Sequence, residues 1–264
     1  MNKKIVFFDI DGTLIECGQG MNRPLKSTVE AIKAIQKNGH LAVVATGRPM
    51  AFMPNFLLDL GFDGYITANG AQIQKKGQVL YSKQIEKETL TKAVDFFKKE
   101  DIDFILEGQQ KAYFSTLSSE AAKRFFQTFL VPKENITENW ELEHVKANKM
   151  VVVLKDETQL EKFKKVLGET FTFMKHPGES SYDVYFSDCT KADGIKIMLD
   201  HLNMDIKNTV AFGDGTNDIE MFQLVKTGIA MGNAKQTLKE EASFITEDVF
   251  SHGILEGLKK AGLL

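Results

Sequence analysis

The sequence predicts an α/β protein in which a parallel-sheet core carries an inserted α+β domain. Two observations lead to this prediction. Short apolar runs alternate with amphipathic stretches near both ends of the chain, whereas the middle contains neighbouring strand-like runs joined by short turns. A chain of 264 residues also suits about two domains, at roughly 150 residues each.

Strands and helices alternate in the first part of the chain. The runs rich in β-branched and aromatic residues, typical of buried strands, are residues 4–8, 41–45 and 65–68. The helices between them are expected at residues 24–38 and 51–60. Gly39 is a suitable C-cap for the first helix, whereas Pro54 is unfavourable within the second. This βαβαβ order implies a parallel sheet with right-handed crossovers.

The middle of the chain has a different pattern. A hairpin is expected over 71–82, turning at Lys76 and Gly77. The expected strands that follow are 102–106, 112–116, 150–154, 171–174 and 183–186. The expected helices are 87–99, 120–129 and 157–167. Adjacent strands with short turns predict an antiparallel sheet with helices on one face.

The alternating pattern returns near the end of the chain, with helices expected at 192–202 and 218–225. Strands are expected at 209–212, 228–231 and 244–246. We therefore predict a Rossmann-like core domain at 1–83 and 189–264, with an α+β domain inserted at 84–188.

Composition excludes several classes of protein. Apolar residues make up 43% and charged residues 26%, which are values typical of folded domains. The net charge of -3 gives no general attraction to nucleic acid or to anionic membranes. Asp9 and Asp11 interrupt the first apolar run, so a signal peptide or membrane span is not expected. Cys17 and Cys189 are too few for a disulfide framework, and we expect a cytoplasmic protein.

Polar motifs follow the expected core strands at their carboxyl ends, where ligands gather in α/β sheets. The motifs are Asp9-Ile10-Asp11-Gly12-Thr13-Leu14, Thr46-Gly47-Arg48, Asn69-Gly70 and Gly213-Asp214-Gly215-Thr216-Asn217-Asp218. Carboxylates gathered at one edge would repel one another and raise each other's pKa, so we expect them to hold a hard cation. Mg²⁺ is the natural candidate, with Thr46, Lys191 and nearby backbone amides available to bind phosphate.

These motifs, in this order, resemble those of the haloacid dehalogenase superfamily, in its type IIB capped, Cof-type branch of sugar phosphatases. Asp9-Ile-Asp11-Gly-Thr-Leu resembles the first motif, Thr46-Gly-Arg48 the second, Lys191 the third, and Gly213-Asp214-Gly-Thr-Asn217-Asp218 the fourth. The stretch Ala230-Met-Gly-Asn-Ala234 is similar to a further Cof-type segment. The insert lies between the second and third motifs, where this branch carries its cap.

The resemblance implies a phosphatase that acts through an aspartyl-phosphate. Asp9 would be the nucleophile, and Asp11 would protonate the leaving alcohol and later activate water. Lys191 would offset charge on the transferring group. The implied metal ligands are Asp9, Asp11, Asp214 and Asp218. The implied phosphate or substrate contacts are Ile10, Thr46, Gly47, Arg48, Asn69, Lys191 and Asn217.

Several alternatives stay open at this point. Arg48 could reach substrate or brace the acidic cluster. The protein could be a phosphomutase, which would return the phosphoryl group to a sugar, or a phosphometabolite sensor without turnover. We expect a small phosphorylated metabolite as substrate and no nucleic-acid or membrane partner. The insert would select the substrate, with polar residues near its strand ends as candidate contacts: Glu107, Tyr113, His176 and Tyr185.

Overall fold

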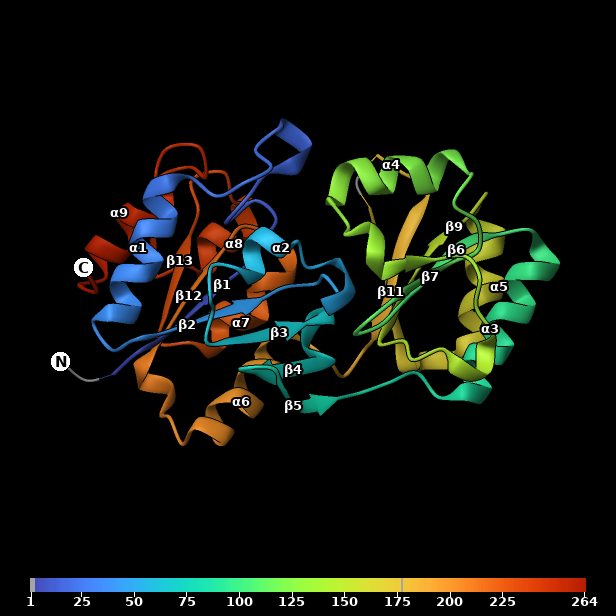
Figure 1. Ribbon diagram of the computed structural model, residues 1–264, viewed down its shortest axis with the longest axis horizontal. Helices are drawn as coiled ribbons and strands as arrows, with labels where there is room; N and C mark the ends of the chain where they lie inside the picture. The colour runs from blue at the N-terminus through green and yellow to red at the C-terminus, as the bar shows by residue number, and fades with distance from the viewer. Residues whose placement is uncertain (1–2, 177) are drawn as a thin grey trace. The chain divides into compact units, whose positions relative to one another are not determined.

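The computed structural model describes residues 3–176 and 178–264, with Gln127 described by its backbone alone (Figure 1). The chain divides into two compact units. The core unit consists of the chain up to Gly47, Asn55–Tyr81 and Thr190–Leu264. The inserted unit consists of Arg48–Pro54 and Ser82–Cys189. Residues 1–2 and Pro177, which fall in the predicted domains, lie outside the described residues.

A sheet of eight strands forms the centre of the core unit, counted over the described residues. Its order is β14-β13-β12-β1-β2-β3-β4-β5. The strands are β1 (Ile5–Phe8), β2 (Leu41–Ala45), β3 (Gly64–Thr67), β4 (Gln72–Lys75), β5 (Gln78–Ser82), β12 (Thr209–Gly213), β13 (Thr227–Ala230) and β14 (Phe244–Ile245). From β14 to β3 the strands are parallel, and β4 pairs antiparallel with β3. The predicted α/β class and the hairpin at Lys76 and Gly77 are confirmed.

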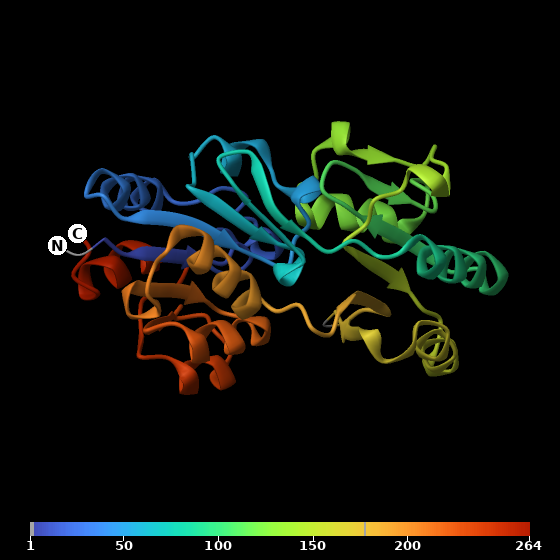
Figure 2. The same cartoon turned by 90° about the horizontal axis from the view of Figure 1, so that it is seen from below.

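Helices cover both faces of this sheet, as the blue α1 and the orange α6 on its opposite sides show (Figure 2). The core-unit helices are α1 (Lys26–Lys37), α2 (Asn55–Leu58), α6 (Lys191–Leu202), α7 (Ile219–Leu224), α8 (Gln236–Glu241) and α9 (Gly253–Lys260). On the face of Ile5 and Phe7, the apolar sides of α6, α7 and α8 complete a buried core. The other face packs against α1 and α9, where Gly257 lies against the ring of Phe212.

The helix expected over 51–60 is interrupted. A 3₁₀ turn spans Met50–Phe52 and α2 spans Asn55–Leu58. Between them Met53 is extended, with φ -75° and ψ 113°. Pro54 explains the break, because its ring disfavours helical geometry in the preceding residue.

The inserted unit has a six-stranded sheet in the order β10-β11-β9-β6-β7-β8, again over the described residues. Its strands are β6 (Asp103–Glu107), β7 (Ala112–Phe114), β8 (Ile136–Thr137), β9 (Lys149–Val153), β10 (Phe171–Lys175) and β11 (Ser181–Phe186). Its helices are α3 (Lys87–Glu100), α4 (Glu120–Phe129) and α5 (Glu157–Leu167). Neighbouring strands are antiparallel except for β7 and β8, which are parallel and joined through α4. The short strand β8 lies in a segment that was expected to be a loop.

The prediction that helices cover one face of this sheet was wrong. Phe97 of α3 and Phe163 of α5 pack together on the face of Phe104, whose ring centroid lies 4.7 Å from that of Phe97. Phe125 of α4 packs instead with Phe114, on the opposite face. The parallel crossover from β7 to β8 explains this, because it carries α4 across the face that α3 and α5 leave open. No helix in the described ranges is both long and apolar enough to cross a membrane.

Candidate active site

The carboxyl end of β1 places Asp9 at the centre of the core unit. The N–H of Asp9 donates to the carbonyl of Phe212 on β12 at 3.1 Å, so the chain leaves the sheet next to the end of that strand. Gly12 then turns with φ 82°, and a Cβ there would overlap the carboxylate of Asp214. The glycine therefore lets the first and fourth motifs approach each other.

Lys191 lies at the start of α6, directly after the N-cap residue Thr190. A capping box fixes this end: Thr190 Oγ1 accepts from Asp193 N–H at 3.1 Å, and Asp193 Oδ2 accepts from Thr190 N–H at 3.2 Å. The Lys191 side chain is fully buried, and its Nζ donates to Asp9 Oδ1 and to Asp218 Oδ1, both at 2.6 Å. Residues 182 positions apart are thereby joined in one ionic triad.

Asp218 organises the loop after β12. Its Oδ1 accepts from Lys191, and its Oδ2 accepts the N–H groups of Asp214 and Gly215, both at 3.0 Å. Asp214 in turn accepts a 2.9 Å hydrogen bond from Thr13 Oγ1. The loop is thus held by hydrogen bonds with the Asp214 carboxylate beside that of Asp9.

Burial and mutual repulsion perturb these carboxyl groups. Burial raises the pKa of Asp9 to about 7, with Asp218 and Asp11 adding to the rise and Lys191 opposing it. Burial, Asp9 and Asp218 raise the pKa of Asp214 to about 8, against the hydrogen bond from Thr13. The pKa of Lys191 is raised, because its two carboxylate partners outweigh the effect of burial. The site therefore resists carrying its full negative charge without further cations.

The acidic group fits a hard divalent cation. Asp9, Asp214 and Asp218 each offer a carboxylate oxygen, and these oxygens lie within 4.8 Å of one another. Oxygen donors and excess negative charge are what Mg²⁺ selects. Both oxygens of Asp218 already accept hydrogen bonds, so Asp9 and Asp214 are the better-placed direct ligands.

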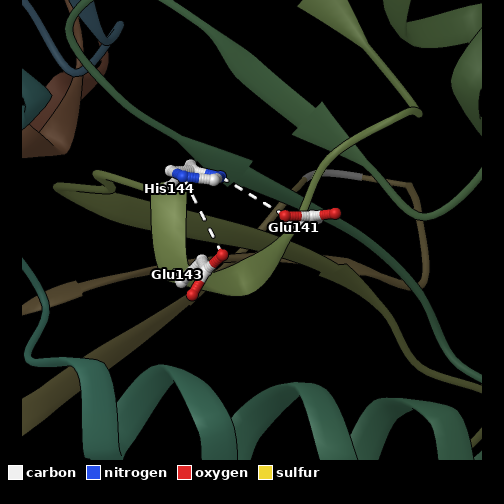
Figure 3. A group of neighbouring side chains, drawn as sticks. All are labelled: Glu141, Glu143 and His144. Atoms are coloured by element: carbon white, nitrogen blue, oxygen red, sulfur yellow. Dashed lines mark ion pairs between the residues drawn. The ribbon is translucent and has the colours of Figure 1, made fainter.

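A second group of possible metal ligands lies in the inserted unit. Glu141, Glu143 and His144 come together beside a 3₁₀ turn (Figure 3). His144 lies 3.6 Å from Glu141 and 3.9 Å from Glu143, and the three side chains are 61–75% exposed. Exposed ion pairs of this kind contribute little to the free energy of unfolding, and we assign no role to these three residues.

Thr46 and Asn69 meet at the ends of β2 and β3. Asn69 N–H donates to the carbonyl of Thr46 at 3.1 Å, and Thr46 is 1% exposed. Ala68 and Asn69 have φ 50° and 53°, in the left-handed region that asparagine tolerates better than alanine does. The Asn69 side-chain amide is buried and has no hydrogen-bond partner among the described residues. It is therefore a polar group still available to a ligand.

The remaining predicted residues occupy different surroundings. Ile10 is fully buried, so it can offer only backbone atoms to a ligand. Asp11 and Asn217 are half-buried. Arg48 belongs to the inserted unit, where its guanidinium donates to the carbonyl of Phe129 at 2.7 Å and lies over the Phe129 ring.

One positioning residue was missed from the sequence. Asn233 Nδ2 donates to the carbonyl of Gly12 at 2.7 Å, and its Oδ1 accepts from Val249 N–H at 3.1 Å. Asn233 thus ties the first motif to the chain after β14. The available signal was the Ala230–Ala234 stretch, which was noted without a role.

Comparisons with known proteins show which family the chain resembles. A model of the haloacid dehalogenase-like hydrolase family matches residues 6–258. The Bacillus subtilis protein named "Putative phosphatase YkrA" is 32% identical over 266 residues, covering 100% of both chains. A phosphoglycolate phosphatase of Methanosarcina acetivorans is 28% identical, covering 98% of this chain and 96% of its own. The solved structure of the subclass IIB sugar phosphatase BT4131 is 29% identical with a TM-score of 0.83, covering 99% of this chain and 100% of its own.

Proposed function

The chain belongs to the haloacid dehalogenase-like hydrolase family and is a phosphatase of its type IIB branch; from this premise we propose that it hydrolyses small phosphate monoesters with Mg²⁺ through an aspartyl-phosphate. The observation that carries the proposal is the Lys191 ammonium, 2.6 Å from both Asp9 and Asp218, beside the Asp214 carboxylate.

In the first step Asp9 acts as the nucleophile. Lys191 donates to Asp9 Oδ1 and fixes the carboxylate, one oxygen of which forms a bond to phosphorus. The bond from phosphorus to the ester oxygen breaks, and that oxygen takes a proton from Asp11. The alcohol leaves, and the phosphoryl group stays on Asp9.

In the second step Asp11 acts as the base. It takes a proton from water, and the water oxygen forms a bond to phosphorus. The bond from phosphorus to Asp9 breaks, which releases inorganic phosphate and restores the Asp9 carboxylate. One carboxyl group at position 11 thus donates a proton in the first step and recovers one in the second.

Charge on the transferring group requires matched donors. We assign this task to the ammonium of Lys191, the hydroxyl of Thr46 and the amides of Gly47 and Asn217. Asp9, Asp214 and the backbone carbonyl of Asp11 would hold Mg²⁺. Bound there, Mg²⁺ supplies Lewis-acid polarisation of the phosphoryl oxygens. Asp218 supports the site by holding Lys191 and the Asp214 loop.

We propose sugar phosphates as the substrate class, with residues 84–188 as the cap that selects among them. The sugar phosphatase activity named for BT4131 supports the class, whereas the Methanosarcina relative is named for phosphoglycolate. Sparing use of cysteine supports the cytoplasm as the compartment.

The test is phosphate release by wild type and by Asp9→Asn, which nearly preserves size but removes the nucleophilic oxygen. We expect turnover to vanish in a protein that still folds, because Asp218 remains as a partner of Lys191. A labelled acyl-phosphate should be trapped on wild type and be absent from the variant. Activity within tenfold of wild type in a folded Asp9→Asn protein would remove Asp9 from this role.

A further inference from the structure

A groove lies beside α3 in the inserted unit. Its volume is about 680 Å³, within the range of small-molecule sites. Residues of α3 line one side, and residues 138–142, which follow β8, line another. Every described lining residue belongs to the inserted unit, so the groove is formed within that unit alone.

Aromatic rings form the floor of the groove. Phe104 is 5% exposed, and its ring centroid lies 4.7 Å from that of Phe97 and 6.0 Å from that of Trp140. Trp140 is half-buried, so part of its indole remains exposed. Its Nε1–H donates to the carbonyl of Phe114 at 2.8 Å. The indole therefore offers a ligand its ring surface and no hydrogen-bond donor.

The other neutral donors of the groove are also used within the protein. Ser115 Oγ accepts from Phe104 N–H at 3.1 Å and lies 3.4 Å from Asp103 Oδ1. Thr116 Oγ1 shares a hydrogen bond of 2.9 Å with Ser118 Oγ. With Trp140, these two hydroxyls are all the neutral side-chain donors among the described lining residues. A ligand must therefore bring its own donors.

Carboxylates outnumber ammonium groups in the groove. Among the described lining residues, Lys98 is the single base, against five acids: Asp95, Asp101, Asp103, Glu138 and Glu141. Asp101 pairs with Lys155 at 2.9 Å, and Glu141 lies 3.6 Å from His144 (Figure 3). The other three acids have no basic partner in the described part of the chain. The groove thus combines an apolar floor with carboxylates that no basic side chain neutralises.

We propose that this groove binds an aliphatic polyamine, with methylene groups on Phe104 and Trp140 and ammonium groups at Asp95 and Asp103. The methylene groups cover rings that an inorganic cation would leave in water. The un-neutralised carboxylates come from α3, β6 and the segment after β8, so a ligand with more than one ammonium group is required. An ammonium group over the indole gains further from the ring face.

The same charges separate this groove from the catalytic site. A phosphate ester is an anion, and the carboxylates at the groove repel it. The inference therefore goes beyond the proposed phosphatase function and does not depend on it.

Trp140 is the sole tryptophan of the sequence, so its fluorescence reports directly on the groove. Spermidine, titrated at about 0.15 M NaCl, should change the emission in a saturable way with a Kd below about 1 mM. Mg²⁺ at matched ionic strength carries positive charge without methylene groups, and it should leave the emission unchanged. An equal response to both cations would overturn the proposal.

Asp95→Asn tests the charge contact by calorimetric titration. Asp95 is exposed and has no partner among the described residues, so the variant should fold like wild type. It should raise the Kd for spermidine about threefold, and the double variant with Asp103→Asn about tenfold. Glu88→Gln is the matched control, because it removes the same charge from α3 at a residue that pairs with Lys92 outside the groove. It should change the Kd less than about 1.5-fold.

Several results would overturn the polyamine assignment. These are no heat and no emission change with spermidine at about 10 mM, equal weakening by Asp95→Asn and Glu88→Gln, or binding of argininamide in place of spermidine. None of these measurements requires turnover. They therefore decide the groove whether or not the protein hydrolyses phosphate esters.

Discussion

Replacing Lys191 with methionine tests the ionic triad most directly. The Lys191 ammonium lies 2.6 Å from Asp9 and from Asp218, and its side chain is fully buried. Methionine retains the apolar volume but leaves two buried carboxylates facing each other and Asp214. Removing one partner of a buried pair costs about 3–5 kcal/mol. We expect a loss of this size in the free energy of unfolding at pH 8 with EDTA present, or a melting temperature lower by about 6–20 °C.

The loss should depend on pH in a defined direction. The pKa of Asp9 is about 7 in the folded protein against 3.8 for the ordinary group, and loss of Lys191 raises it further. A raised carboxyl pKa lowers stability as pH rises through it, because the folded state must then hold an unfavourable charge. At pH 5.5 Asp9 is already protonated, so we expect the loss to fall to about 2 kcal/mol or less.

Urea unfolding of wild type and Lys191→Met at pH 5.5 and pH 8.0 measures both quantities. Lys196→Met on the same helix is the control, because Lys196 is 57% exposed and makes a surface pair with Asp193. The control should change stability by less than about 1 kcal/mol. A loss below about 1 kcal/mol for Lys191→Met at pH 8, or an equal loss at both pH values, would refute the reasoning.

Four further measurements test other parts of the site. Asp11→Ala should lower kcat for a sugar phosphate by about 10²–10⁴-fold but affect an aryl phosphate less, since a phenolate leaves without protonation; equal single-turnover losses would count against the acid role. Mg²⁺ should raise the melting temperature more at pH 8.5 than at pH 5.5, because protons occupy Asp9 and Asp214 at the lower pH, and equal shifts would contradict the assigned ligands. The free energy of unfolding should fall between pH 5 and pH 8, because the pKa of buried Glu107 is about 7 and its ionisation destabilises the folded state. Glu107→Gln should remove up to about 3 kcal/mol of this fall. Parallel pH profiles of the two proteins would contradict the ionisation of a buried Glu107. Asn233→Ala should destabilise the protein by about 1–3 kcal/mol and increase the Mg²⁺ concentration for half-maximal activity. If both quantities stay unchanged, the hydrogen bond from Asn233 to Gly12 does not position the first motif.

The local sequence predicts the core unit well, because apolar periodicity identifies its strands and helices and parallel strands all run in one direction. Parallel strands end at one edge, so motifs following β1 and β12 had to approach each other, and Asp9, Asp214 and Asp218 do. Gly12 shows why the motif needs its glycine, since a side chain there would overlap Asp214. The roles of these residues in catalysis stay predictions.

The parts that the sequence did not predict depend on contacts between distant segments. The apolar side of α4 fits either face of the inserted-unit sheet, and the choice is made by the crossover to β8, a strand of two residues. The contact between Asn233 and Gly12 joins residues 221 positions apart, and neither position shows it locally. Glu107 was noted as a candidate contact, but its neighbour Lys149 was not, because pairing across β6 and β9 fixes that proximity.

The assignment of Arg48–Pro54 to the inserted unit has a consequence for dissecting the protein. The chain passes between the units four times, after Gly47, Pro54, Tyr81 and Cys189. Phe52 is buried among the side chains around α4, and the carbonyl of Ala51 accepts from Asn135 across 84 positions. Excising 84–188 would leave Phe52 without the apolar neighbours that bury it. The remaining fragment would then expose an apolar patch that promotes aggregation. A stable fragment therefore requires a second cut that replaces residues 48–54 with polar residues. During ribosomal synthesis, Phe52 likewise has no apolar neighbours from α4 until that helix has left the ribosome.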